Sequence, residues 1–254
     1  MIGNRLKITI ITAVLNSKKF IEDCIQSVLH QNYKNIEHIV IDGGSTDGTL
    51  ETIKKYQPGI AKVVSERDDG IYDAMNKGIR LAIGEVIGIL NADDFYPDSG
   101  ILEKVAQIFE DEDIESCYGD LEYVNAVNTA KVVRHWRSGP FHINKFYWGW
   151  MPPHPTFFVR RSVYQRYGLF NLTLGSAADY ELMLRFLVKH RITTAYIPKV
   201  IVKMRMGGVS NAAVKNRIRA NLMDREAWRV NGLRPYPWTL LFKPVRKFHQ
   251  VFIR

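Results

Sequence analysis

Carboxylate and amide side chains follow four short apolar runs in the first 95 residues, where they could bind a ligand. The runs end in Asn16, in Asp42-Gly43-Gly44-Ser45, in Ser65-Glu66-Arg67-Asp68-Asp69-Gly70 and in Asn91-Ala92-Asp93-Asp94. An acidic pair after a strand suits a hard divalent cation, commonly held by one or two carboxylates plus substrate phosphates. The competing interpretation is that these residues only form loops and helix caps, as Asp93-Asp94 would before a helix at 101–109.

Motifs of several other enzyme classes are missing. A dinucleotide site needs G-x-G-x-x-G after the first strand, and residues 13–19 contain no glycine. Gly43 and Gly48 have P-loop spacing, but Thr49 and Leu50 follow, so the phosphate-binding lysine is absent. The chain also lacks G-x-S-x-G, H-E-x-x-H and C-x-x-C. Hydride transfer, P-loop chemistry and the common hydrolase mechanisms are therefore disfavoured.

The elements that must position these residues alternate between strands and helices. Apolar, β-branched segments span 8–14, 36–41, 61–65 and 86–90. Residues 20–29 and 71–83 place apolar side chains at helical spacing, and a shorter helix is expected after Asp47. This alternation indicates a parallel sheet covered on both faces, which binds ligands beyond the carboxyl ends of its strands. The polar segments fall at that edge.

The second half of the chain has a different pattern. Residues 115–160 suggest antiparallel strands and glycine- and proline-rich loops, whereas 179–188 has the pattern of an amphipathic helix. Residues 195–204 are expected to form a further strand.

Composition indicates an ordinary globular protein of one large domain, with or without appendages. The chain has 254 residues, 46% hydrophobic and 24% charged, and its two cysteines, Cys24 and Cys117, do not have metal-site spacing. A reducing compartment is the simpler interpretation. The apolar run at 8–14 is too short for a signal peptide, and no run of about 18 uncharged apolar residues exists. We expect a cytoplasmic location without a membrane-spanning helix.

Almost all of the net charge of +9 lies at the carboxyl terminus. From Lys215 onward there are ten Lys and Arg residues and two acids, which gives 10 − 2 = +8. Aromatic residues are interleaved with them at Trp228, Tyr236, Trp238, Phe242, Phe248 and Phe252. Charge confined to one terminal segment favours an anionic surface over nucleic acid as the partner, because no nucleic-acid-binding module is visible.

The ordered segments T-A-V-L-N (12–16), I-D-G-G-S-T-D-G-T (41–49), S-E-R-D-D-G-I-Y-D-A-M-N-K-G-I (65–79) and L-N-A-D-D (90–94) resemble those of family 2 glycosyltransferases. The branch that builds bacterial surface polysaccharides is the most similar. The resemblance implies a GT-A fold, a Rossmann-like and mostly parallel sheet flanked by helices, over residues 1–210. A nucleotide-sugar-binding half would span about 1–95 and an acceptor half about 96–210. Residues 211–254 would form a helical, basic and aromatic extension.

The resemblance also implies roles for residues of the first half. Thr12, Val14 and Asn16 would line the nucleoside, Asp42 would face the base or ribose, and Asp69 would lie near the base. Gly43 stands where the family often has a second acid, which leaves base selectivity open.

The family's D-x-D motif reads Asn91-Ala92-Asp93 here. Asp93 would bind the metal, Mn²⁺ or Mg²⁺, and the donor diphosphate. Asn91 would be a weaker ligand that still hydrogen-bonds ribose or phosphate.

The family's catalytic base follows a glutamate at a helix start, and here the pair reads Ala178-Asp179. The resemblance makes Asp179 the base, although an aspartate there also suits a helix cap. A single base opposite the leaving group gives inversion at the anomeric carbon. His154, between prolines, would contact acceptor or phosphate, or be only a loop residue. Arg205, before Gly207-Gly208, would belong to a loop that closes over phosphates, or to a plain turn.

The expected activity is therefore transfer of a hexose-like sugar from a nucleoside diphosphate, with UDP favoured, to a saccharide or lipid-linked hydroxyl. Surface-polysaccharide synthesis at the inner face of the cell membrane would suit the basic extension. A nucleotidyltransferase would want a glycine-rich basic loop after the first strand, which residues 13–19 lack. A degenerate, non-catalytic subunit is the other alternative, favoured by Asn91, Gly43 and Ala178.

Overall fold

Strands β1 to β4 form the parallel half of one sheet in the computed structural model, which describes residues 6–207 and 214–240, excepting the side chains of 214–221. They are β1 (Ile8–Val14), β2 (Ile36–Asp42), β3 (Lys62–Ser65) and β4 (Val86–Ile89), in the spatial order β3-β2-β1-β4. All their mutual pairings are parallel. These positions match the four apolar runs, and β1, β2 and β4 are largely buried, as strands covered on both faces are, whereas the edge strand β3 is partly exposed.

The sheet continues into an antiparallel half. β7 (Phe158–Arg160) pairs with β4 and with β5 (Ser116–Val124), and β6 (Val132–Trp136) follows β5. The twelve-residue β8 (Thr194–Arg205) runs parallel to β5, so the described residues form an eight-stranded sheet. β8 ends beside the segment after β4, where Phe95 and Lys203 form an isolated bridge. This return brings the last strand to the ligand edge of the first half.

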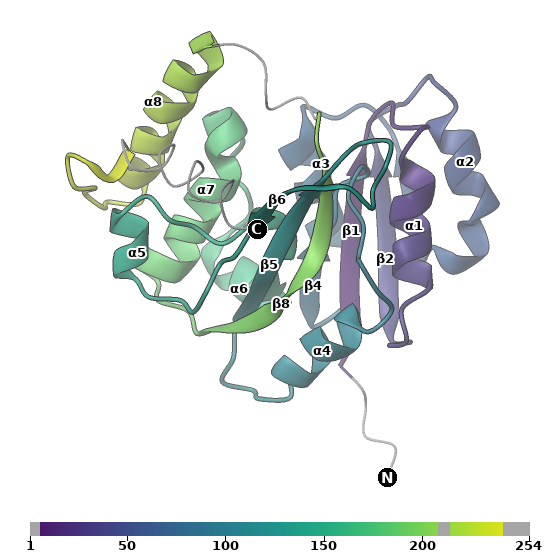
Figure 1. Cartoon of the computed structure of the whole chain (residues 1–254), viewed down its shortest axis with the longest axis horizontal. Helices are drawn as coiled ribbons and strands as arrows, with labels where there is room; N and C mark the ends of the chain where they lie inside the picture. Colours follow the sequence, from purple (N-terminus) through teal and green to yellow (C-terminus); the bar gives the residue numbers. More distant parts are fainter. Residues whose placement is uncertain (1–5, 208–213, 241–254) are drawn as a thin grey trace.

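Helices cover both faces of the sheet (Figure 1). α1 (Ile21–Leu29), α2 (Thr49–Lys55) and α4 (Ile101–Ile108) pack on the face that carries Ile8, Ile10 and Val14. α3 (Ile71–Leu81), α5 (Asn144–Tyr147), α6 (Arg161–Tyr167) and α7 (Ala178–Met183) share the other buried cluster, which includes Ile11 and Ile39. The alternation of buried residues along β1 therefore assigns each helix to its side.

α3 lies unusually close to β1 because Gly78 faces the strand. A Cβ at Gly78 would lie 2.4 Å from Cγ2 of Ile11, which no real contact allows. The glycine therefore sets the height of α3 above the sheet, and with it the loop that starts α3.

The helix expected at 179–188 is present with a change of pitch. α7 ends at Met183, and a π-helical turn, η4 (Leu184–Lys189), continues it. Short 3₁₀ turns complete the described elements: η1 (Gln57–Gly59), η2 (His154–Thr156) and η3 (Leu172–Ala177).

The expected domain boundary at residue 210 lies outside the described residues. Beyond it, α8 (Val214–Val230) packs on α7. Trp228 is fully buried and donates from Nε1 to the Tyr180 hydroxyl at 2.9 Å, and Asn231 donates to Glu181 at 3.1 Å. The basic residues from Lys243 onward lie outside the described part. Within that part, no helix is both long and apolar enough to cross a membrane.

Candidate active site at the carboxyl edge of the sheet

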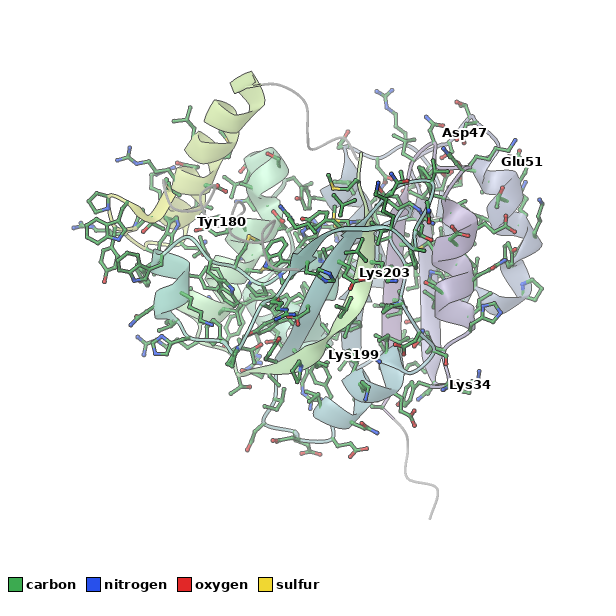
Figure 2. The ribbon with its side chains drawn as sticks, in the orientation of Figure 1. Lys34, Asp47, Glu51, Tyr180, Lys199 and Lys203 are labelled. Carbon is green, nitrogen blue, oxygen red and sulfur yellow. The ribbon has the colours of Figure 1, made fainter. Side chains whose placement is uncertain are left out.

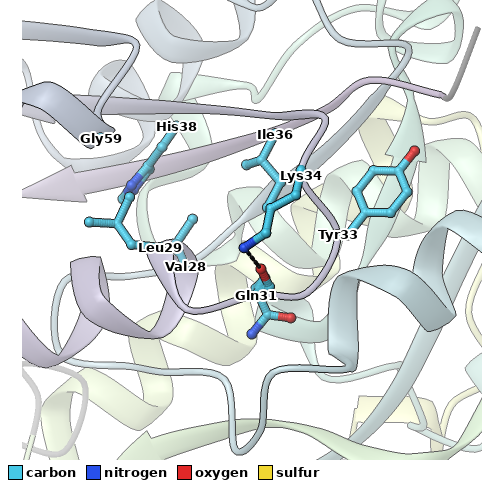
Figure 3. A pocket seen from close by; sticks show the side chains of 8 residues that line it. All are labelled: Val28, Leu29, Gln31, Tyr33, Lys34, Ile36, His38 and Gly59. Atoms are coloured by element: carbon cyan, nitrogen blue, oxygen red, sulfur yellow. Dashed lines mark hydrogen bonds between the residues drawn. The ribbon is translucent and has the colours of Figure 1, made fainter.

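The loops after β1 to β4 lie at one edge of the sheet, as the alternation predicts. Figure 2 shows Asp47 and Glu51, which follow β2, at the upper edge, and Lys34, which precedes β2, at the lower one. A pocket at the lower edge, lined by Leu29, Lys34 and His38 among others, therefore lies at the amino ends of the strands (Figure 3). The predicted site residues belong to the upper edge.

Asn16 joins the first two loops. It adopts a left-handed conformation, with φ 49°, which asparagine tolerates better than most residues. Its Oδ1 accepts from the Thr46 amide at 2.9 Å, and its own amide donates to Ser45 Oγ at 2.8 Å. The exposed Asn16 is thus held in place by the turn that follows Asp42.

Asp42 is fully buried beneath that turn. Its carboxylate accepts from the Ser65 hydroxyl at 2.6 Å, from the Ser45 amide at 3.2 Å and from the Ser45 hydroxyl. These bonds tie the ends of β2 and β3 together. The described geometry makes Asp42 a loop-fixing residue, with its carboxylate engaged by protein donors.

Thr12 and Val14 do not bring their side chains to the edge. Thr12 Oγ1 lies 3.1 Å from Nε2 of His38, and Val14 packs with Ile21 and Val40 under α1 and α2. Even-numbered side chains of β1 all point to that covered face. At Thr12 and Val14, therefore, only backbone groups could contact a ligand.

Asp68, and not the predicted Asp69, turns toward the β2 turn. A Cβ at Gly43 would lie 3.1 Å from Oδ2 of Asp68, so this carboxylate stands against the position where the family often has a second acid. Asp69 is exposed, and its amide donates to Asp73. Lys77 binds Asp68 at 2.6 Å and Glu66 at 2.8 Å, and these bonds raise the Lys77 pKa above its ordinary range. Lys77 of α3 thus pairs with two carboxylates of this loop.

The two acids after β4 face opposite ways. Asp94 is fully buried, and Asn91 Nδ2 donates to its Oδ2 at 3.2 Å. Burial, reinforced by the neighbouring Asp93 carboxylate, raises the Asp94 pKa well above its usual value. Asp93 is partly exposed, whereas Ala92 between them is buried in the α1–α2 cluster. The helix-cap interpretation fails here, because α4 begins at Ile101 with Gly100 as its N-cap.

The residues after β4 suit a cation that is held partly by substrate. Asp93 supplies one partly exposed carboxylate, and Oδ1 of Asn91 is buried without a hydrogen-bond partner in the described structure. No cluster of three or more His, Cys, Asp or Glu with metal geometry occurs among the described residues. Such a donor set matches Mg²⁺ or Mn²⁺ bound through one carboxylate plus phosphates.

Arg205 reaches the same segment from the end of β8. Its side chain is only 4% exposed, donates from Nη1 to the Asp93 carbonyl at 2.8 Å and pairs with Asp23 of α1. Its guanidinium also lies over the rings of Phe20 and Phe95. The bond to the Asp93 carbonyl ties the end of β8 to the Asp93 segment.

Asp179 and His154 lie together in a pocket between α3 and α7. His154 Nδ1 is 3.3 Å from Asp179 Oδ2. The pocket is otherwise walled mainly by apolar and aromatic side chains, among them Met75, Ile89 and Phe157. Asp179 is not the helix cap, because Ala177 occupies that position and α7 begins at Ala178. The pocket therefore places the Asp179 carboxylate next to a nitrogen of the His154 imidazole, beside β4.

Tyr72 is a pocket residue that sequence reasoning missed. It lies within the motif 65–79 but carries no distinctive spacing. Burial raises its pKa above the ordinary range, and the nearby Asp179 carboxylate raises it further. Its proximity to Asp179 follows from α3 packing beside α7, which local sequence does not encode.

Comparisons with known proteins bear on the family and the fold of this chain. The family model described as Glycosyl transferase family 2 matches residues 9–168. A PGL/p-HBAD biosynthesis glycosyltransferase of Mycobacterium bovis (strain BCG / Pasteur 1173P2) is 30% identical over 211 residues, covering 81% of this chain and 80% of the relative. An uncharacterized glycosyltransferase of Haemophilus influenzae is 27% identical over 223 residues, covering 82% and 68% of the two chains.

Two solved structures share the fold. Residues 1–349 of S. aureus TarS, in complex with UDP-GlcNAc, superpose with a TM-score of 0.66 at 18% identity, covering 86% of this chain and 65% of that one. This chain spans 39% of the longer TarS structure. The mannosyltransferase PcManGT from Pyrobaculum calidifontis, in complex with GDP-Man and Mn²⁺, gives 0.65 at 19% identity, covering 98% and 70%.

Proposed function

This chain belongs to glycosyltransferase family 2, and from that membership we propose that it moves a sugar from a nucleoside diphosphate to a saccharide or lipid-linked hydroxyl. The observation that carries the proposal is the placement of the Asp93 segment and the Asp179 pocket around β4, since Ile89 of that strand lines the pocket. A donor-phosphate site and a candidate base thus flank one strand end. Turnover of a nucleotide sugar with a hydroxyl acceptor is the direct test.

The donor would lie across the loops after β1, β2 and β4. Asn16 and Asp68 are candidates for nucleoside contacts, Asp42 would hold their loops in place, and Thr12 and Val14 would contribute backbone only. Asp69, exposed beside them, stays a candidate for contacting the nucleobase. UDP is our first choice, and the two structural neighbours were solved with UDP-GlcNAc and GDP-Man.

A panel of nucleotide sugars tests which nucleobase the donor carries. A ligand that binds only the folded chain raises its melting temperature, and at equal concentration the tighter ligand raises it more. UDP-sugars should stabilise the protein more than GDP-sugars at equal concentration. Equal or larger shifts with GDP-sugars would overturn the assignment.

A divalent cation would be held by Asp93 and the two donor phosphates, with Asn91 at its side. When bound, it offsets the negative charge that develops on the departing diphosphate. The mannosyltransferase neighbour was solved with Mn²⁺. Arg205 would keep the Asp93 backbone in register with this site.

Asp179 would take the proton of the acceptor hydroxyl as general base. A carboxylate within about 3 Å of the hydroxyl accepts that proton as the new glycosidic bond forms and the diphosphate leaves. With one base opposite the leaving group, the anomeric configuration inverts. Nuclear magnetic resonance of the product's anomeric proton distinguishes inversion from retention.

The basic extension would place the enzyme on an anionic membrane, near a lipid-linked acceptor for surface-polysaccharide synthesis. Near an anionic surface each Lys or Arg contributes about 1 kcal/mol of binding. Because Trp228 is part of the core, removing residues 211–254 would also disturb α7. Substituting Lys243, Arg246 and Lys247 with Gln is the cleaner change. The triple variant should cosediment less with anionic vesicles than the wild type, and equal partitioning would contradict the proposal.

A further inference from the structure

His154 is held rigidly at the mouth of the pocket that contains Asp179. It opens the 3₁₀ turn η2 and is flanked by Pro153 and Pro155. The buried Thr156 anchors this turn, since its Oγ1 lies 2.8 Å from the Pro153 carbonyl and 3.2 Å from that of Gly119 on β5. The imidazole therefore projects from a backbone that is fixed to the sheet.

Among the described residues, Asp179 is the charged partner of the His154 ring. Its Nδ1 faces Oδ2 at 3.3 Å, and the other carboxylate oxygen, Oδ1, accepts from the Tyr180 amide at 2.8 Å. An ionised carboxylate can only accept, so a hydrogen bond between the two groups requires the proton on Nδ1. The histidine side chain is 34% exposed and the aspartate 17%, which places the imidazole on the solvent side of the pair.

The walls of the pocket offer few other ways to orient Asp179. The titratable lining residues besides the pair are Tyr72 and Tyr164, and the rest are apolar, among them Phe170 and Leu182. No Lys or Arg belongs to the described lining. The Tyr72 hydroxyl interacts with Asp179 as well, so this hydroxyl and the His154 imidazole are the lining side chains that can direct the carboxylate.

We propose that His154 is a positioning residue for the general base. It donates from Nδ1–H to Oδ2 of Asp179 and thereby fixes the carboxylate plane, so that a free lone pair points at the acceptor hydroxyl. The proton of that hydroxyl passes to Asp179 and the hydroxyl oxygen bonds to the anomeric carbon. The bond from that carbon to the diphosphate oxygen breaks and the nucleoside diphosphate leaves, while His154 keeps its own proton. This inference rests on the proposed transferase function.

Substituting His154 with asparagine or glutamine distinguishes a positioning role, which needs a donor at the place of Nδ1, from a role that needs only side-chain volume. The Asn amide nitrogen occupies the place of imidazole Nδ1, whereas the Gln amide reaches the place of Nε2. Misplacement of a catalytic group by about 1 Å costs on the order of 100-fold. His154→Ala and His154→Gln should therefore lose about 30- to 100-fold in kcat with the donor KM unchanged, and His154→Asn should recover most of the rate.

His135 provides a matched control, because its Nδ1 lies 3.2 Å from Oε1 of Glu122 on the β5–β6 hairpin, outside the pocket. His135→Ala should keep wild-type kcat. The double variant Asp179→Asn with His154→Ala should be no slower than Asp179→Asn alone, because positioning has no value without the base. Wild-type kcat in His154→Ala, a change confined to the acceptor KM, or additive losses in the double variant would each overturn the proposal.

A spectroscopic measurement tests the pair without turnover. In protein labelled with ¹⁵N-histidine and free of donor, proton–nitrogen correlations should show His154 protonated at Nδ1. In Asp179→Ala the Nε2-protonated tautomer, which free imidazole side chains prefer, should replace it. An unchanged tautomer would overturn the inference even if the enzyme transfers sugar, whereas absent transfer with the expected tautomers would fault only the proposed function.

Discussion

At the scale of single residues, the structure divides the acidic segment after β4 into a ligand-facing and an inward-facing half. Asp93 is partly exposed, and Asp94 is buried with a raised pKa and a hydrogen bond from Asn91. The sequence shows two adjacent acids but not which of them turns inward. That choice depends on the packing of α1 against the segment, which brings Cys24 close to both carboxylates.

Matched substitutions of this pair should behave differently. Asp93→Asn removes the charge proposed for metal binding, so transfer should be lost while the fold remains. Asp94→Asn keeps the shape of a side chain whose charged form is disfavoured by burial, so activity and stability should stay near wild type. Steady-state rates and thermal unfolding of both variants check this, with excess chelator as the parallel test. Full activity of Asp93→Asn, or of wild type in chelator, would contradict a role for a metal ion in transfer.

The nucleoside side of the site shows where residue types alone mislead. Asp68 and Asp69 are adjacent and equally acidic, and only the path of the loop decides that Asp68 faces Gly43. Thr12 and Val14 lie at the predicted edge, but strand alternation directs their side chains into the core. Position along the chain was predictable, whereas side-chain direction needed the packed structure.

At the scale of elements, Arg205 links β8 to α1 and to the Asp93 segment. Arg205→Met keeps much of the buried volume but removes the bond to the Asp93 carbonyl. We expect donor affinity to fall about 10- to 150-fold, because losing a hydrogen bond to a charged group costs roughly 1.5–3 kcal/mol. Calorimetric titration with the donor and the cation measures it. Lys203→Met, on the same strand and partly exposed, should bind as wild type. Equal affinity of Arg205→Met would contradict the bracing role.

His38 makes the packing of β2 under α1 sensitive to pH. Burial lowers the pKa of His38 to about 4, below the ordinary value of 6.5. The unfolded chain therefore binds the proton first, so the free energy of unfolding should decrease as pH falls from about 6.5 to about 4 and then level off. The loss attributable to His38 is on the order of 3 kcal/mol.

Urea unfolding at several pH values measures that loss. His38→Gln should flatten the dependence between pH 6.5 and 4, and the exposed His142→Gln should keep the wild-type slope. The same slope in His38→Gln would mean that another group is responsible.

At the scale of the whole molecule, the order of strands and helices was predictable because continuous apolar strands and helical spacing are local signals. The return of β8 beside the Asp93 segment was not, since it pairs residues more than 100 positions apart. The packing of α8 on α7 through Trp228 also escaped local patterning. The charge excess in this segment is plain in the sequence, but its buried face is visible only in the fold.

Asp179 is proposed to act as the base in sugar transfer from a nucleotide donor. The most direct measurement compares wild type with Asp179→Asn, using the nucleotide sugar that stabilises the fold most and a hydroxyl acceptor. Asn keeps the shape of the side chain but cannot take the proton, so kcat should fall at least ~100-fold with donor affinity unchanged. Wild-type turnover by Asp179→Asn, or no transfer by the wild type from any nucleotide sugar, would contradict the account.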